Sequence, residues 1–174
     1  MSLYTRSGDD GTTLMRGERI LKSHPKVVAC GGLDELQCLF GVAASMADAP
    51  TRKLLCRLQQ DLFVLNAELA GYGSDCAITP VDVCRLEELI DRCEAHLPPL
   101  RQFILPGGST AGALLHLARA VARRAEREIV HLAQTEHVPS SILAYVNRLS
   151  DLLFVLARRT NMLAGSSEEP WSRH

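Results

Sequence analysis

One stretch decides how this chain folds: Leu114-Leu115-His116-Leu117-Ala118-Arg119-Ala120-Val121-Ala122-Arg123-Arg124-Ala125-Glu126-Arg127. At about 100° per residue, its apolar and polar side chains separate onto opposite sides of a helix. The apolar sector holds Leu114, Ala118, Val121, Ala122, Ala125 and Ile129. The opposite arc, about 100° wide, holds His116, Arg119, Arg123, Glu126 and Arg127. The pattern predicts a helix with one buried face, and leaves open whether its cationic face is solvated or binds a ligand.

Length and composition predict one globular domain. The 174 residues are 47% hydrophobic and 22% charged, which supplies one buried core. Aromatic residues make up only 5%, while Leu and Ala dominate, so packed helices are favoured over strands. A formal net charge of -1 offers no electrostatic footprint for nucleic acid or a membrane. We therefore expect neither as a partner.

Proline and glycine divide the chain into five predicted helices. The expected helices span residues 27–49, 51–70, 79–96, 109–133 and 140–163. Thr79-Pro80-Val81-Asp82 is typical of a capped start, and Pro106-Gly107-Gly108 precedes Ser109 as the next cap. The sequence thus predicts an all-α, five-helix bundle with short connections.

The domain is expected to have three parts. An amino-terminal segment, residues 1–26, precedes the bundle, 27–164, and a loosely ordered tail, 165–174, follows, in which Trp171 is able to dock. Six cysteines, Cys30, Cys38, Cys56, Cys76, Cys84 and Cys93, show no C-x-x-C pair. This favours buried, reduced thiols over a metal site or disulfides, and we predict no protein metal site. The chain shows no apolar run of about 18 residues, so we predict no membrane span.

The amino-terminal stretch Tyr4-Thr5-Arg6-Ser7-Gly8-Asp9-Asp10-Gly11-Thr12-Thr13 combines glycines, hydroxyls and a cation. Glycines allow successive backbone N–H groups to point at one anion, and hydroxyls and a guanidinium add donors. That chemistry suits a polyphosphate, although the spacing is not that of a Walker A loop. An ordinary turn is the alternative, and it stays open.

A second polar stripe is expected on the last helix. Within about 40° of Asn147 on that helix lie Asp151, Phe154, Arg158 and Asn161. A plain solvent face would carry more Lys and Glu, so a functional and a solvated stripe remain equally open.

Five blocks, in order, resemble the signatures of the PduO-type ATP:cob(I)alamin adenosyltransferases. The blocks are Thr5-Arg6-Ser7-Gly8-Asp9-Asp10-Gly11-Thr12-Thr13, Gly32-Leu33-Asp34-Glu35-Leu36, Phe103-Ile104-Leu105-Pro106-Gly107-Gly108, residues 119–127 and Asn147-Arg148-Leu149-Ser150-Asp151. They cover the chain from residue 4 to about 161. Departures at Cys30-Gly31 and Gln37 concern local packing and substrate affinity, and leave the phosphate and arginine positions intact.

The resemblance implies a homotrimer of five-helix bundles with active sites between subunits. In the implied reaction, the cobalt of cob(I)alamin attacks C5′ of ATP, giving adenosylcobalamin and triphosphate. ATP, Mg²⁺ and cobalamin are the expected ligands, and a cobalamin reductase and an adenosylcobalamin-dependent enzyme are possible partners. The alternatives are an adenosylcobalamin carrier without efficient catalysis, and a structural bundle without a nucleotide site.

The matching motifs also imply residue roles. ATP would be bound by Thr5, Arg6, Ser7, Gly8, Asp9, Gly11, Thr12, Thr13, Lys22, Arg123, Glu126 and Asn147. Asp34 would pair with Arg119 across the subunit boundary, and Phe103 would lie beside the cobalt, where its apolar ring keeps the lower ligand away. Without the resemblance, Asp34 would be part of an exposed acidic pair and Phe103 an ordinary core aromatic.

The residue types agree with that chemistry. Substitution at carbon needs no general base; it needs alignment, and cations that stabilise charge on the leaving triphosphate. Arginine suits this role because its planar fork binds two phosphate oxygens, and Mg²⁺ would be held largely by phosphates and water. His116 is expected to be hydrogen-bonded within the bundle, and Arg124 to serve structure or the trimer contact. Because the phosphate motif begins at Tyr4, no targeting peptide fits before it and we expect a cytoplasmic protein.

Overall fold

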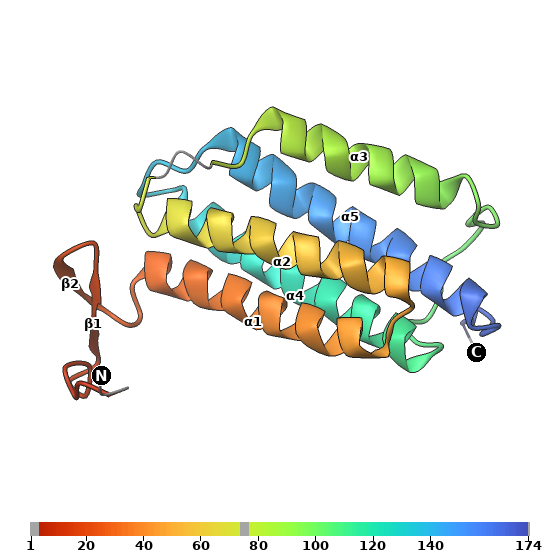
Figure 1. Ribbon diagram of the computed structural model, residues 1–174, viewed down its shortest axis with the longest axis horizontal. Helices are drawn as coiled ribbons and strands as arrows, with labels where there is room; N and C mark the ends of the chain where they lie inside the picture. The colour runs from red at the N-terminus through yellow and green to blue at the C-terminus, as the bar shows by residue number, and fades with distance from the viewer. Residues whose placement is uncertain (1–3, 74–76, 174) are drawn as a thin grey trace.

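The computed structural model describes residues 4–73 and 77–173, which form five helices and one β-hairpin (Figure 1). The helices are α1 (Pro25–Met46), α2 (Ala49–Leu69), α3 (Pro80–Glu94), α4 (Thr110–Leu132) and α5 (Ser140–Leu163). α4 packs against α1 and α5, while α2 covers α1 and α3 covers α5. The predicted bundle is therefore confirmed, with boundaries within a few residues of the predicted ones.

Caps and prolines account for the helix starts. The Ser109 side chain accepts a hydrogen bond from the Gly112 N–H (3.1 Å), so α4 begins where the sequence indicated. Thr79 and Asp82 form the expected reciprocal capping box of α3. The boundary between α1 and α2 differs from the prediction, because Pro50 lies in the first turn of α2 and does not end α1.

The core is built from leucines and alanines of all five helices. On α4, Ala118, Val121, Ala122, Ala125 and Ile129 are buried, and Leu114 is half-buried, as the periodicity predicted. Tyr145 of α5 is the largest fully buried side chain. Its hydroxyl donates to Asp61 of α2 (2.8 Å), which also pairs with Arg85 of α3 (2.7 Å). This polar cluster gives a buried hydroxyl the partner it requires.

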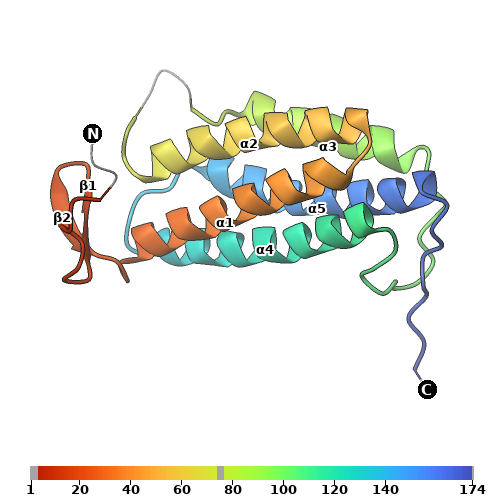
Figure 2. The same cartoon turned by 60° about the horizontal axis from the view of Figure 1, so that its bottom comes forward.

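The β-hairpin was not predicted, so the all-α class holds for the bundle only. β1 (Thr12–Met15) pairs antiparallel with β2 (Glu18–Leu21), with Thr13 opposite Ile20. Arg16 and Gly17 form the turn with φ of 52° and 85°. A two-residue hairpin turn of type I′ needs positive φ at both positions, and Arg-Gly is not a typical pair for it. Figures 1 and 2 show the hairpin beyond the start of α1, at one end of the bundle.

The tail is tied down, contrary to the loose order that we expected. The Leu105 N–H donates to the Glu169 carbonyl (2.8 Å), and the Trp171 N–H donates to the Phe103 carbonyl (2.8 Å). Trp171 therefore docks through its backbone, while its side chain stays half-exposed. The tail pairs in an extended form with the connection between α3 and α4.

The cysteines differ from the expectation of buried thiols. Cys38, Cys56 and Cys84 are exposed and Cys30 and Cys93 half-buried, all five as free thiols. Burial raises the pKa of the Cys30 and Cys93 thiols, which lowers their reactivity. The sixth, Cys76, lies outside the described residues.

Two core helices have the length and composition of a membrane span, against the sequence prediction of none. They are α1 and α5, whose apolar windows are 44% and 56% buried in the bundle. The core helices of soluble bundles pass the same test. Both helices supply much of the hydrophobic core here, which accounts for their apolar composition.

Candidate functional site

A groove of about 400 Å³ opens between α3, α4, α5 and the connection that precedes α4. Three predicted site residues line it: Phe103 from the connection, and Arg119 and Arg123 from successive turns of α4. Asp151 and Phe154 of α5 complete its polar and apolar sides. The cationic face of α4 and the polar stripe of α5 therefore meet at one place.

Phe103 is 81% exposed, so it is not the core aromatic of the alternative interpretation. Its neighbour Ile104 also lines the groove and forms a bridge with Pro170 of the tail. An exposed phenyl ring costs solvation free energy unless a ligand covers it. The ring is thus placed to contact an apolar ligand surface.

The two arginines of the groove are not neutralised by the chain itself. Arg123 is exposed, and its guanidinium has no hydrogen bond or ion pair with any described residue. The Arg119 guanidinium lies 5.9 Å from the centre of the Phe154 ring, a cation–π distance, and its buried Nε has no partner in the described part of the chain. Both cations are available to an anionic ligand or partner.

Glu126 and Asn147, which the resemblance implies as ATP-binding residues, contact each other. The Asn147 side-chain amide donates to a Glu126 carboxylate oxygen (2.9 Å), joining α4 to α5. Arg148 lies beside them and bridges Glu87 of α3 (3.0 Å) and Asp151 (3.3 Å). This network keeps the polar side of the two helices in a defined arrangement.

The amino-terminal loop is closed by cations. Lys22 Nζ donates to the Gly8 carbonyl (2.7 Å), and Arg19 donates to the Ser7 carbonyl (2.7 Å). The Thr12 hydroxyl donates to Asp10 (2.6 Å) and, with the Thr12 N–H and Arg19, lowers the pKa of that carboxyl. Sequence reasoning missed Arg19; only the hairpin pairing, which brings it opposite Leu14, places it by the loop.

The remaining predicted loop residues surround the same turn. The hydroxyls of Thr5 and Ser7 are 2.7 Å apart, and the Arg6 guanidinium lies 5.6 Å from the Tyr4 ring centre. Gly11 has a φ of 81°, a left-handed conformation that glycine adopts without strain. Asp9 and Thr13 continue the turn into β1. The loop gathers hydroxyls and cations, as polyphosphate binding requires.

This loop and the groove are separate within one chain. No hydrogen bond or ion pair links residues 5–22 to Arg119, Arg123, Glu126 or Asn147 in the part of the molecule described. Asp34 of α1 is exposed and does not pair with Arg119 of its own chain. The predicted residues therefore fall into two separate groups within one chain, one at the amino-terminal loop and one at the Phe103 groove.

His116 behaves differently from the prediction, whereas Arg124 behaves as predicted. His116 is only 3% exposed, and neither ring nitrogen has a partner among the described residues, so the expected hydrogen bond is absent. Instead its ring meets Phe154 edge to face, 5.9 Å between centres, and burial, with Arg119 nearby, lowers its pKa. Arg124 pairs with Glu35 of its own chain, which supports the structural role.

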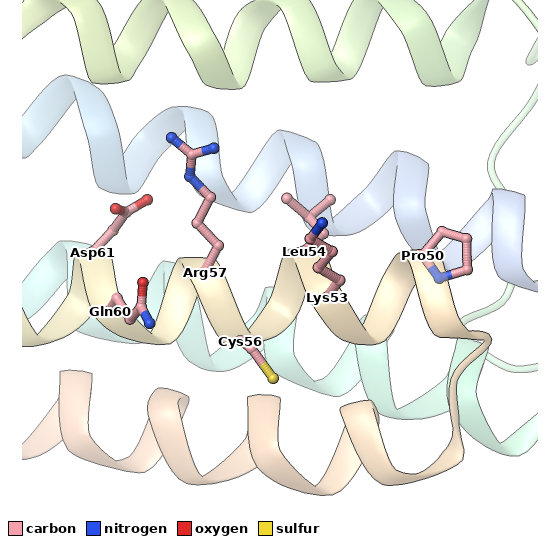
Figure 3. A pocket seen from close by; sticks show the side chains of 7 residues that line it. All are labelled: Pro50, Lys53, Leu54, Cys56, Arg57, Gln60 and Asp61. Atoms are coloured by element: carbon pink, nitrogen blue, oxygen red, sulfur yellow. The ribbon is translucent and has the colours of Figure 1, made fainter.

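A larger groove of about 850 Å³ runs along α2 and holds none of the predicted site residues. Figure 3 shows Lys53, Arg57 and Asp61 on successive turns of this helix. The Asp61 carboxylate already accepts from Tyr145 and pairs with Arg85, which is a structural use. We therefore place the functional site at the loop and the Phe103 groove.

Known proteins resemble this chain over most of its length. The family model described as cobalamin adenosyltransferase matches residues 3–160. This chain belongs to the cobalamin adenosyltransferase family. It is 46% identical over 165 residues to the corrinoid adenosyltransferase PduO of Salmonella typhimurium, covering 91% of this chain and 49% of that one. It is 43% identical over 174 residues to the cobalamin adenosyltransferase of Cupriavidus metallidurans, covering 98% and 94%.

Solved structures of the family share the fold. A phenylalanine-to-histidine variant of a PduO-type ATP:corrinoid adenosyltransferase from Lactobacillus reuteri, complexed with cobalamin and ATP, superimposes with a TM-score of 0.92. The sequences are 34% identical, over 99% of this chain and 97% of that one. The chain spans about half the length of the PduO relatives of Salmonella typhimurium and Citrobacter freundii.

Proposed function

We propose that this protein transfers the 5′-deoxyadenosyl group of ATP to the cobalt of cob(I)alamin, giving adenosylcobalamin and triphosphate. The observation that carries the proposal is the groove that exposed Phe103 shares with two guanidiniums, neither of which has an anionic partner among the described residues. An apolar ring beside free cations suits a large, flat cofactor next to a polyphosphate. Family membership and the complexed relatives support the same pair of substrates.

The chemistry is a substitution at carbon. The cobalt(I) electron pair forms the Co–C5′ bond as the C5′–O bond breaks, and both electrons of that bond leave with triphosphate. Arg123 would stabilise the negative charge that grows on the leaving oxygens, and Phe103 would occupy the space in which a lower axial ligand otherwise approaches the cobalt. The rest of the rate enhancement would come from alignment.

The amino-terminal loop is the proposed triphosphate site. Lys22 and Arg19 now donate to the carbonyls of Gly8 and Ser7, and these donors can turn toward phosphate oxygens. Mg²⁺ would arrive with the triphosphate. Within residues 4–73 and 77–173, no three His, Cys, Asp or Glu side chains converge, so such an ion would take its ligands mainly from phosphate and water.

The complete site requires a neighbouring subunit, and we propose the family's homotrimer. The loop lies off the end of the bundle, away from the middle of α4, where Arg123 lies (Figure 2). Exposed Asp34 and the partly buried Arg119 both lack counter-charges within the described chain. An intersubunit pair of these two residues would satisfy both, since a partly buried cation is costly without a partner.

One assay tests the proposed reaction against both alternatives. The purified protein is mixed with ATP, Mg²⁺ and chemically reduced cobalamin, and adenosylcobalamin and triphosphate are quantified. We expect both products in equal amounts. Adenosylcobalamin binding without product would indicate the carrier function, and calorimetry without ATP binding would leave only the structural bundle.

The reaction also predicts partners. Cobalt(I) must be generated by a reductant, and the product is used by adenosylcobalamin-dependent enzymes. We therefore propose a cobalamin reductase and such an enzyme as neighbours of this protein in the cytoplasm.

A further inference from the structure

The position of the exposed Phe103 ring depends on the segment that carries this residue. It lies in the connection between α3 and α4, residues 98–109, which we name the Phe103 strap. Because the ring is 81% exposed, core packing does not hold it. Its position must be set by the backbone of the strap and by whatever binds that backbone.

The first end of the strap is held by Arg158 of α5. This arginine is only 4% exposed, and one of its terminal nitrogens donates to the Pro98 carbonyl (2.8 Å). Its Nε and the same terminal nitrogen also donate to Glu168 (2.6 and 3.1 Å). One buried guanidinium thus joins the start of the strap to the tail.

The other end is held by Asn161, one turn further along α5 and 3% exposed. Its Nδ2 donates to the Gly107 carbonyl (2.8 Å), and its Oδ1 accepts from the Ser109 N–H and hydroxyl (2.9 Å each). Gly108 has a φ of 102°, and a Cβ there would overlap the Asn161 side chain. The Pro-Gly-Gly turn is therefore shaped around this amide.

The middle of the strap is paired with the tail. The Leu105 N–H donates to the Glu169 carbonyl, and the Trp171 N–H donates to the Phe103 carbonyl. The paired tail segment starts next to Glu168, the residue that Arg158 binds. Arg158 therefore binds both segments of this small ladder, the strap and the tail.

We propose that Arg158 is a positioning residue for Phe103, acting through Pro98, Glu168 and the paired tail. Removing the charge of Arg158 leaves the Glu168 carboxylate without its cation. Because loss of one member of a buried ion pair is strongly destabilising, the strap and the tail are then no longer held together. The ring of Phe103 then moves, and a lower ligand can reach the cobalt. This consequence rests on the proposed function, whereas the anchoring does not.

Amide hydrogen exchange tests the anchoring alone. In Arg158→Gln we expect the Leu105 and Trp171 amides to exchange at least about tenfold faster than in the unsubstituted protein, as local opening becomes easier. Arg159→Gln is the matched control, since Arg159 is the next residue on α5 and donates to Thr51 of α2. If both amides in Arg158→Gln were as well protected as in the unsubstituted protein, the proposal would be overturned. Glu168→Gln provides a milder variant if Arg158→Gln does not fold.

Kinetics and spectroscopy test the effect on Phe103. In Arg158→Gln we expect kcat for adenosylcobalamin formation to fall by up to about 100-fold, with the KM for ATP unchanged. A small displacement of the Phe103 ring is enough to slow the reaction by this much. Cob(II)alamin bound with ATP should show less of the species without a lower ligand by electron paramagnetic resonance.

A double-mutant cycle gives the decisive result. In a Phe103→Ala background, Arg158→Gln should cause no further loss of kcat, since it acts through that ring. The same loss in both backgrounds would overturn the positioning role. No product from the unsubstituted protein would overturn the proposed function, and the exchange measurement would still decide the anchoring.

Discussion

Arg123 is the residue whose removal should matter most for the reaction. Arg123→Ala should lower kcat by about 100-fold, because one donor to developing charge contributes about 3 kcal/mol. The assembly should stay intact, since the guanidinium is exposed and makes no hydrogen bond or ion pair with a described residue. Product formation and size-exclusion chromatography measure the two effects.

Arg127→Ala is the control for that substitution. Arg127 lies one turn further along α4, is exposed, and donates to the Arg123 carbonyl (3.0 Å). The Arg127→Ala substitution changes the net charge by the same amount as Arg123→Ala, but Arg127 does not line the Phe103 groove. An equal loss in both variants would mean a general charge effect and would contradict the role of Arg123.

His116 predicts a pH dependence of stability. Burial, with Arg119 nearby, lowers its pKa below 6.5, while Glu168 opposes the shift. The folded protein then binds this proton less readily than the unfolded chain, so its contribution to stability is present above pH 6.5 and is lost as the pH falls below that value. His116→Phe removes the titration but keeps an aromatic ring against Phe154.

Thermal unfolding between about pH 7.5 and about pH 5.5 checks this dependence. The unsubstituted protein should lose more melting temperature over that interval than His116→Phe does. Parallel curves for the two proteins would show that His116 titrates normally, against its buried position.

At the scale of single elements, the start of α4 tolerates no added side chain. A Cβ at Gly112 would overlap Asn161, which cannot move without losing its bonds to Gly107 and Ser109. Gly112→Ala should therefore lower the free energy of unfolding by about 1–3 kcal/mol. Chemical denaturation measures the change.

Gly41→Ala provides the contrast for that prediction. A Cβ at Gly41 of α1 would meet Gln59 at 3.5 Å, an ordinary contact, so the better helix former should add about 0.5–1 kcal/mol. If both alanines stabilised the protein, the tight packing around Asn161 would be refuted.

The hairpin shows where element prediction from sequence failed. Its strands have four residues each, too short for alternation to stand out, and its turn lacks the usual Asn-Gly or Asp-Gly pair. The helices succeeded because each repeats its pattern over at least 15 residues and has a cap or proline near its start. Detection thus depended on the length of the repeating pattern.

At the scale of the whole molecule, a site shared between subunits predicts complementation. Lys22→Ala disables the loop and Arg123→Ala the groove, so each homotrimer should be inactive. Randomly mixed trimers should regain about one quarter of the activity, because one site in four then combines an intact loop with an intact groove. Coexpression followed by the product assay measures this recovery.

The matched pair Arg123→Ala and Phe103→Ala should not complement. Both residues line the same groove of one subunit. Each variant subunit therefore carries a damaged groove, whichever subunit lies next to it. A native site would need a subunit with both Phe103 and Arg123, and neither variant provides one. Recovery of activity with this pair, or no recovery with the first pair, would contradict the proposed site shared between subunits.

Sequence by itself determined the bundle and named three residues that line one groove. Helical periodicity reports which face of each segment is apolar, and that face must be buried wherever the segment packs. This periodicity predicted the cationic row of α4, and the motifs that resemble the adenosyltransferases could be identified in the sequence alone. Phe103, Arg119 and Arg123 were named in this way, and they share one groove.

Only the tertiary structure decided how those residues are held. Arg158 and Asn161 were seen as members of a polar stripe, but their partners lie at Pro98, Glu168 and Gly107, in other segments of the chain. His116 looked polar by its position on the helix, yet Phe154 and the neighbouring helix bury it. Burial and hydrogen-bond partners depend on contacts between distant segments, which the periodicity of one helix does not contain.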